Sequence, residues 1–290
     1  MVYQNTKSIL HRQGLAPHKK LGQNFLIHRH TAERIIDLAD PDPGDTVIEV
    51  GVGLGALTHP LAEQVKQVIG IEADSGLIRW LEKEQDLPAN VKLIHRDILK
   101  TNFSELAEQA GGRLKILANL PYSISSPFLF KLIEHYQLME WAVVMLQKEV
   151  AVRLMAEPGT KEYGAPTVLM ASCATIEPLL KVRQGEFHPR PKVDSLVIRL
   201  SFFPVSERIK NTPGFDRTLF RKVVNSAFGQ RRKTLLNGLS SGGFAKDKKT
   251  MAEIIRQAGL SPGIRGERLS FEEFVTLTNC IEAAGSQTPS

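Results

Sequence analysis

An amide, a proline and an aromatic ring follow directly after an apolar run. Residues 119–122 read Asn-Leu-Pro-Tyr, and they come after Leu114-Lys-Ile-Leu-Ala118, which has the pattern of a buried strand. A strand that only has to turn can end in Gly or Asp. This segment instead presents a planar hydrogen-bonding group, Asn119, and a flat ring, Tyr122. The pair indicates contact with a planar ligand.

These residue types suit methyl transfer to the exocyclic amino group of a base. The lone pair of that nitrogen is delocalised, and its proton leaves only as the new bond forms, so a basic side chain helps little. The Asn119 side chain and the Leu120 carbonyl can accept its two N–H groups, while Pro121 removes a competing N–H and stiffens the turn. Tyr122 offers a face for an extruded base. The segment predicts catalysis by positioning and electrostatics; the alternative is a plain turn with a core tyrosine.

A glycine run follows an earlier strand-like segment. Residues 49–55 read Glu-Val-Gly-Val-Gly-Leu-Gly, a spacing that differs from the Gly-x-Gly-x-x-Gly of dinucleotide binding. The Glu49 carboxylate would repel a phosphate and attract a cationic ligand. S-adenosylmethionine, which carries a sulfonium and an α-amino group, is such a ligand. Gly51 and Gly53 are candidate cofactor contacts, because glycine lets the backbone approach a ligand closely. The alternative is a glycine turn that serves packing alone.

Two further acids end the next strand-like runs. Glu72 lies 21 positions after Gly51, where a carboxylate can accept both ribose hydroxyls. Asp97, in His95-Arg-Asp97, can accept from an adenine amine, although a lone aspartate at a strand end is often a cap. Ligands of open parallel sheets bind beyond the carboxyl ends of the strands. Three acids at successive strand ends therefore predict a nucleoside cofactor.

The elements that must position these residues alternate. Strand-like runs cover residues 46–51, 67–72, 91–95, 114–118 and 141–146, with helical spacing over 57–65, 77–84 and 128–136. This alternation predicts an α/β fold with a parallel sheet covered on both faces. A further strand at 195–202 is expected to form an edge pair with 174–182. After Pro204 only helices are expected, at 215–228, 231–239, 247–258 and 271–282, which divides the chain into domains 1–205 and 206–290.

Composition describes a soluble protein with unevenly placed charge. Of 290 residues 42% are hydrophobic and 23% charged, and no apolar run approaches the roughly 20 residues of a membrane span. Cys173 and Cys280 have no metal or redox spacing, so we expect no metal site and a cytoplasmic location.

Two basic stretches, at 1–32 and 217–233, contain no acid, although the net charge is only +6. They predict a polyanionic partner. The alternative is solvated helix faces, or cations paired with acids such as Glu272 and Glu273. The candidate RNA contacts are Arg221, Lys222, Arg231, Arg232 and Lys233.

Six ordered motifs carry a resemblance over nearly the whole chain. They are Lys20-Leu-Gly-Gln-Asn-Phe-Leu26, Glu49 to Gly55, Asn119 to Tyr122, Gln147-Lys-Glu-Val150, Phe187-His-Pro-Arg-Pro-Lys-Val-Asp-Ser195 and Phe228-Gly-Gln-Arg-Arg-Lys-Thr-Leu-Leu-Asn237. With them the chain resembles the small-subunit ribosomal RNA adenine N6,N6-dimethyltransferases. The resemblance implies a Rossmann-like class I methyltransferase domain with a smaller helical domain. It also implies a monomer that dimethylates two adjacent adenosines in the hairpin near the 3′ end of small-subunit (16S) ribosomal RNA, on a pre-30S particle.

The resemblance also implies site residues. Carried over by position, the cofactor site comprises Asn24, Leu26, Gly51, Glu72, Asp97 and Asn119, with Gln23 and Asn24 closing over the methionine end. Phe187 resembles the aromatic that sandwiches the base opposite Tyr122. The chain departs from the family pattern at His28, where Asp is usual, which affects the cap of the next helix. It also departs at 151–152 and 165–167, away from the inferred site.

Rival functions come from three other classes. A nicotinamide-dependent oxidoreductase is disfavoured by the glycine spacing. A non-catalytic ribosome assembly factor, or a mitochondrial-type transcription factor of the same descent, is disfavoured by the intact Asn-Leu-Pro-Tyr. A large-subunit methyltransferase of the antibiotic-resistance type is the nearest alternative, and the motifs at 187–195 and 228–237 favour the small-subunit type.

Overall fold

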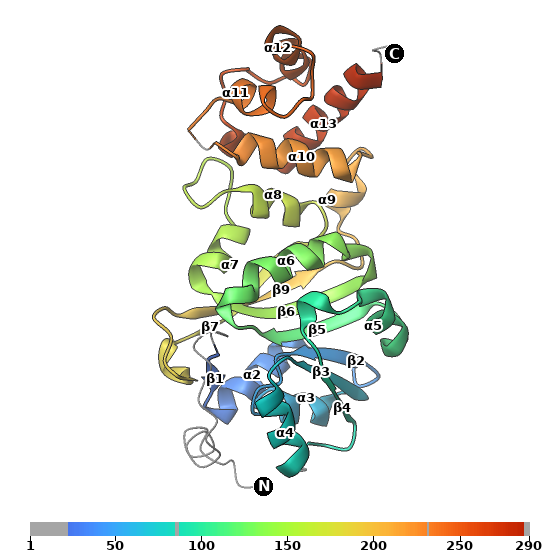
Figure 1. The fold of residues 1–290 in the computed structure, drawn as a ribbon, viewed down its shortest axis with the longest axis vertical. Coiled ribbons are helices and arrows are strands. Elements are labelled where there is room, and N and C mark those ends of the chain that lie inside the picture. The colour runs from blue at the N-terminus through green and yellow to red at the C-terminus, as the bar shows by residue number, and fades with distance from the viewer. Residues whose placement is uncertain (1–22, 85–86, 231, 287–290) are drawn as a thin grey trace. The chain divides into compact units, whose positions relative to one another are not determined.

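A twisted sheet forms the framework of the first part of the chain (Figure 1). The structure is a computed structural model, and it describes residues 23–84, 87–230 and 232–286. The strand order is β4-β3-β2-β5-β6-β9-β7, in which β2 to β6 are parallel and β9 is antiparallel to both β6 and β7. The strands are β2 (Thr46–Val50), β3 (Gln67–Glu72), β4 (Val91–His95), β5 (Leu114–Asn119), β6 (Met139–Gln147), β7 (Thr175–Val182) and β9 (Ser195–Ser201). The predicted parallel sheet is confirmed.

Helices connect the parallel strands, and they are α3 (Thr58–Gln64), α4 (Ser75–Glu84), α5 (Phe103–Ala110) and α6 (Ser125–Glu134). α2 (Arg29–Ala39) precedes β2, and α7 (Lys148–Leu154) follows β6. Local sequence sets their ends. For example, the Asn102 side chain accepts from the Ser104 N–H at the start of α5, and Gly111, with φ of 77°, ends it in the left-handed conformation.

The predicted edge pair is present at one end of the sheet, where β7 pairs antiparallel with β9. β9 lies between β6 and β7, and β7 is the outermost strand on that side. Pro178 explains the choice, because a proline cannot donate to a neighbouring strand and is tolerated at an edge. The register also shifts between Pro178 and Leu180, which interrupts the ladder there.

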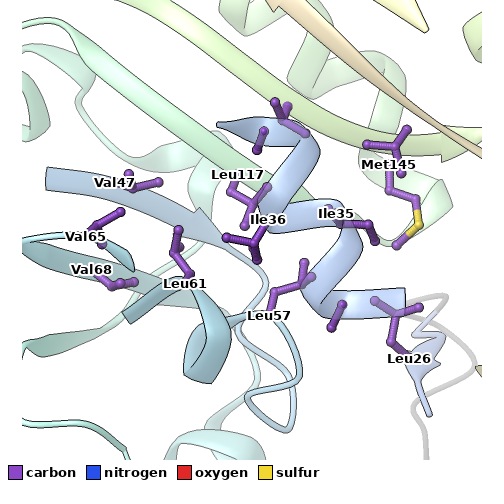
Figure 2. Close-up of a cluster of buried hydrophobic side chains, with 14 of the residues drawn as sticks. Leu26, Ile35, Ile36, Val47, Leu57, Leu61, Val65, Val68, Leu117 and Met145 are labelled. Atoms are coloured by element: carbon purple, nitrogen blue, oxygen red, sulfur yellow. The ribbon is translucent and has the colours of Figure 1, made fainter. Parts of the chain in front are cut away.

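A buried apolar cluster fixes α2 and α3 on one face of the sheet. Figure 2 shows Ile35 and Ile36 of α2 among side chains from β2, β5 and β6. Each of these side chains is at most 2% exposed. Burying such residues contributes on the order of 1.5–3 kcal/mol per large side chain. Further members of the cluster are Leu26, Val47, Leu57, Leu61, Val65, Val68, Leu117, Met145 and Phe187.

A small second sheet was not predicted. β1 (Phe25–Leu26) pairs antiparallel with β8 (Phe187–His188), which follows the short helix η5 (Gln184–Glu186). The pair brings the start of the described chain against a segment about 160 residues later in the sequence. Both segments contribute a side chain to the core cluster, through Leu26 and Phe187.

The chain divides into two compact units. The sheet unit comprises Met1–Ala151 and Thr175–Pro204, and the helical unit comprises Val152–Ala174 and Val205–Ser290. Residues 152–174 are predicted to belong to the first domain, whereas in the structure they group with the helical unit. The Tyr163 hydroxyl donates to the Leu269 carbonyl at 2.7 Å, and Arg217 donates to the Ser172 carbonyl at 3.1 Å.

The helical unit contains the four helices expected after Pro204. They are α10 (Arg217–Phe228), α11 (Leu235–Ser240), α12 (Lys248–Gln257) and α13 (Phe271–Ser286), with α8 (Ala165–Ala171) and the short α9 (Glu207–Lys210) besides. Side-chain caps start three of them: Asp216 accepts from Thr218 N, Thr234 from Asn237 N, and Asp247 from Thr250 N. Within the described ranges, none of the helices has the length and apolar character that crossing a membrane demands.

Candidate active site

A pocket opens where the strand order of the sheet reverses, between β2 and β5. From β2 the chain continues outward to β3 and β4, and then returns to place β5 on the other side of β2. At such a point the connecting helices leave a crevice at the carboxyl ends of the strands. The pocket there has about 560 Å³ of empty space, part of it open to solvent. Its lining includes Asn24, Leu26, Glu49, Gly51, Gly53, Glu72, Asn119 and Pro121.

The glycine loop forms the floor of this pocket. Gly51, Gly53 and Gly55 all have positive φ, between 60° and 81°, which disfavours side chains there. A β-carbon on Gly51 would lie 3.3 Å from the Asn119 carbonyl, and one on Gly53 would lie 3.2 Å from the Phe25 ring. The absence of side chains therefore keeps β5 and the β1 segment close around the same space.

Glu49 is buried in the wall of the pocket without a compensating charge. Both of its carboxylate oxygens are buried, and among the residues that the structure describes neither has a hydrogen-bond partner. Burial raises the pKa of Glu49 to about 8; the nearby Thr58 hydroxyl opposes this rise, and the Glu72 carboxylate adds to it. A buried, unsatisfied carboxyl group is costly. An ammonium-bearing ligand in the pocket relieves that cost, so the site fits the predicted cofactor.

Glu72 holds the glycine loop in place. One carboxylate oxygen accepts from the Gly53 N–H at 2.9 Å, and the other accepts from the N–H groups of Ala73 and Asp74, both at 2.8 Å. Burial raises its pKa, and these backbone hydrogen bonds oppose the rise. A carboxylate offers about four acceptor positions, and these three bonds leave Oε2 room for one hydrogen bond from a ligand hydroxyl. Glu72 therefore both lines the pocket and shapes it.

Two residues of the segment 119–122, Asn119 and Pro121, line the pocket, whereas Leu120 and Tyr122 are not among its lining residues. Asn119 ends β5, and Pro121 starts the short helix η3 (Tyr122–Ile124), whose first turn closes from the Ile124 N–H to the Pro121 carbonyl at 3.1 Å. That bond leaves the Leu120 carbonyl out of the turn, while the Leu120 side chain is buried at 3% exposure. The half-buried Tyr122 ring is held by a hydrogen bond of 2.8 Å between its hydroxyl and the Ser195 hydroxyl.

Two further predicted site residues lie outside the lining of the pocket. Asp97 is not among the residues that line the pocket; its carboxylate accepts from the Leu99 N–H at 2.9 Å and so caps η2 (Ile98–Lys100). Phe187 is only 3% exposed and packs in the core cluster, so its ring has no open face in this conformation. Their roles toward adenine and the target base stay predictions.

Other residues of the site had weak signals in the sequence. Phe25, Leu54 and Leu77 pack together as an apolar part of the pocket wall. Leu77 follows the helical spacing of α4, but nothing in its spacing points to a ligand. Ser195 fixes Tyr122 from 73 positions away, and only a knowledge of which strands pair reveals that contact.

The predicted RNA contacts lie on the helical unit. Arg221 and Lys222 are exposed on α10, and Arg232 and Lys233 are exposed just before α11; Arg231 and the basic stretch at 1–22 lie outside the described residues. The acids suggested as partners are engaged elsewhere. Arg208 lies 3.7 Å from Glu272, and Glu273 accepts from the Ser270 N–H at 2.7 Å.

Comparison with known proteins adds independent information. The family model "Ribosomal RNA adenine dimethylase" matches residues 14–281. A relative named ribosomal RNA small subunit methyltransferase A, from Desulfotalea psychrophila, is 50% identical over 99% of this chain and 98% of its own length. One of the same name from Bacillus mycoides is 42% identical over 95% of each chain.

Two solved structures share the architecture over most of their length. A dimethyladenosine transferase from Plasmodium falciparum matches with a TM-score of 0.75 and 26% identity, covering 90% of this chain and 98% of that one. The 23S ribosomal RNA methyltransferase ErmE matches with a TM-score of 0.65 and 25% identity, covering 89% of this chain and all of that one.

Proposed function

The chain belongs to the ribosomal RNA adenine dimethylase family, and from this premise we propose that it dimethylates N6 of two adjacent adenosines in the hairpin loop near the 3′ end of small-subunit (16S) ribosomal RNA. It is an enzyme that methylates small-subunit ribosomal RNA with S-adenosylmethionine as the methyl donor. The predicted methyltransferase fold and family are confirmed. The observation that carries the proposal is that Asn119 and Pro121 line the same pocket as Glu49 and Glu72.

The pocket residues bind and orient the donor. S-adenosylmethionine, when bound, supplies an electrophilic methyl group on a sulfonium. Glu49 would hold its ammonium group, Glu72 would accept from a ribose hydroxyl, and Asn24 and Leu26 would cover it. Gly51 and Gly53 let the loop pass close to its neighbours, because a β-carbon at these positions would press on the Asn119 carbonyl and the Phe25 ring respectively. We assign Asp97 to the adenine side, at the end of the strand next to β3.

The groups at residues 119–122 position the acceptor nitrogen. The Asn119 side-chain oxygen and the Leu120 carbonyl would each accept one N–H of the adenine amino group, which directs its lone pair toward the methyl. The Ser195 hydroxyl fixes the Tyr122 ring, so the base can stack on a surface whose orientation is set beforehand. Phe187 would cover the other face of the base once its ring turns out of the core.

We assign recognition of the folded RNA to the helical unit. In this proposal residues 1–205 form the catalytic domain and 206–290 the RNA-binding domain, with 152–174 as a part of the latter's packing. Exposed Arg221, Lys222, Arg232 and Lys233 would neutralise phosphates. Arg231 joins them by sequence. The chain would act as a cytoplasmic monomer on a pre-30S particle.

The large-subunit alternative is less well supported. The two relatives named for the small subunit are 50% and 42% identical to this chain, whereas the 23S enzyme is 25% identical. A non-catalytic assembly factor has no use for an open pocket in which a buried carboxyl group lacks a partner.

Mass spectrometry of ribosomal RNA tests the substrate. Unmethylated small-subunit particles and large-subunit RNA would each be incubated with the purified chain and S-adenosylmethionine. We expect N6,N6-dimethyladenosine at two adjacent positions of the small-subunit hairpin alone. Methylation of large-subunit RNA instead would overturn the assigned substrate, and methylation of neither RNA would overturn the activity.

A further inference from the structure

A two-stranded sheet links the cofactor pocket to the segment that carries Phe187. In its register Phe25 lies opposite His188, and Leu26 lies opposite Phe187. Phe25 and Leu26 line the pocket, so a displacement of β1 changes the shape of the pocket. Strands of two residues are too short to be stable alone. Other contacts must therefore hold β1 against β8.

Glu186 supplies such contacts with both its backbone and its side chain. Its carbonyl accepts from the Ile27 N–H at 3.0 Å, directly beyond β1. Its carboxylate oxygen Oε2 accepts from the Thr31 hydroxyl at 2.7 Å and lies 3.0 Å from Nδ1 of His28. We call Glu186, Ile27, His28 and Thr31 the Glu186 clasp. It covers the junction between β1 and α2.

The clasp is anchored on a rigid element. Thr31 lies in the first turn of α2 and is 7% exposed, and α2 packs into the core through Ile35 and Ile36 (Figure 2). The ring of His30 stacks on that of His28 with centroids 5.5 Å apart, which limits the orientations of His28. His28 makes no side-chain cap for α2, so its ring is directed to Glu186 instead.

We propose that Glu186 is a positioning residue for methyl transfer, which holds the pocket-lining β1 segment against the strand that carries Phe187. The inference rests on the proposed function, because it assigns β8 to the base side of the reaction. Without the clasp, β1 moves away from the pocket part of the time. The apparent affinity for the donor then falls with the fraction of closed molecules.

Four variants test the clasp through the dissociation constant of S-adenosylmethionine, measured by calorimetry. Glu186→Ala removes both side-chain contacts and is expected to weaken binding about tenfold, the effect of losing one charge-assisted hydrogen bond. Glu186→Gln retains an acceptor without the charge, and we expect an intermediate loss. The exchange variant, with His28→Glu and Glu186→His together, restores the pair between positions 28 and 186 but not the carboxylate acceptor for Thr31, and it is expected to recover part of the lost affinity. Glu33→Gln, which breaks the Arg29–Glu33 ion pair of α2 instead, serves as the matched control and should bind like the wild type.

The outcomes separate this inference from the proposed function. Calorimetry reports on the clasp even if no RNA is methylated, in which case only the proposed function fails. Unchanged affinity in Glu186→Ala would overturn the clasp. A loss that the exchange variant does not repair would also overturn it, because it would mean that Glu186 serves the fold rather than this contact.

Discussion

At the scale of single residues, the buried Glu49 carboxylate lowers the stability of the fold at high pH but favours the binding of a cationic ligand. Its pKa of about 8 in the folded chain lies above the ordinary value of 4.5, because burial disfavours the charged form, so the protonated form is favoured in the folded chain. Stability from this group is present in full below the lower value and is lost as the pH rises through the higher one. We expect Glu49→Gln to flatten the decline of the unfolding free energy over this range, and to be more stable than the wild type at pH 8.5 by a few kcal/mol.

Urea denaturation at several pH values measures this effect. Glu63→Gln, which replaces an exposed acid on α3, is the control and should keep the slope of the wild type. Equal stability of Glu49→Gln and the wild type at pH 8.5 would contradict the burial that we describe.

The same substitution should weaken the binding of S-adenosylmethionine. An ammonium group beside Glu49 favours the carboxylate, so the wild type should release a proton on binding near pH 7. Calorimetry in two buffers of different ionisation enthalpy counts that proton. We expect Glu49→Gln to bind more weakly and to release none, and identical proton release in both proteins would exclude Glu49 as the partner of the donor.

Residue types at strand ends were predictable, but their contacts were not. Glu49, Glu72 and Asn119 follow apolar runs, and the rule for parallel sheets brings such positions to one edge. Asp97 also follows a strand, but in this structure its carboxylate caps the next turn and does not line the pocket, so its role toward adenine stays a prediction. The hydrogen bond from Tyr122 to Ser195 depends on how β6 pairs with β9, which no local pattern specifies.

At the scale of elements, the glycine loop and β1 must fit together. Gly53→Ala places a β-carbon 3.2 Å from the Phe25 ring, whereas Gly111→Ala has nothing within 4 Å. Both glycines have positive φ, so each alanine costs about 1–2 kcal/mol of stability from backbone strain. We expect only Gly53→Ala to weaken donor binding as well. Thermal melting and calorimetry of the two variants, side by side, separate strain from contact, and equal donor affinity in both would refute the contact.

The longer helices and strands could be predicted from the periodicity of the sequence, whereas the pairing of the two short strands could not. The five parallel strands repeat β-branched runs that fill a sheet buried on both faces. β1 and β8 have two residues each, too few for any period to be recognised. Pro178 confines β7 to the edge of the sheet, so β9 lies inside it. The proline is visible in the sequence, but its consequence for β9 follows only once the strand order is known.

At the scale of the whole molecule, the exposed cations of the helical unit should govern RNA affinity. We expect Arg232→Gln with Lys233→Gln to weaken binding to small-subunit particles equally for different loop sequences. The salt dependence should flatten by a slope of about one per lost phosphate contact. Lys248→Gln with Lys249→Gln removes the same charge from α12 and is the control. Filter binding at several salt concentrations measures these slopes. Equal slopes in the two double variants would contradict the assignment of Arg232 and Lys233 to RNA binding.

The division of the chain into two units could be predicted only in part from the order of its helices and strands. A change from mixed elements to helices alone marks residue 205, but nothing local shows that residues 152–174 pack with helices that come later. Tyr163 and Ser172 reach Leu269 and Arg217 across 106 and 45 positions. Such long-range contacts are visible only once the chain has folded.

The most direct test of the account is single-turnover methylation by Asn119→Ala at saturating S-adenosylmethionine and small-subunit particle. Mass spectrometry would count methylated adenosines over time, and circular dichroism would verify the fold. Because the Asn119 oxygen is assigned to hold the amino group as its nitrogen attacks, we predict a rate about 10²–10³ lower than that of the wild type. A variant that methylates at the wild-type rate would contradict the central claim that this strand end positions the target nitrogen.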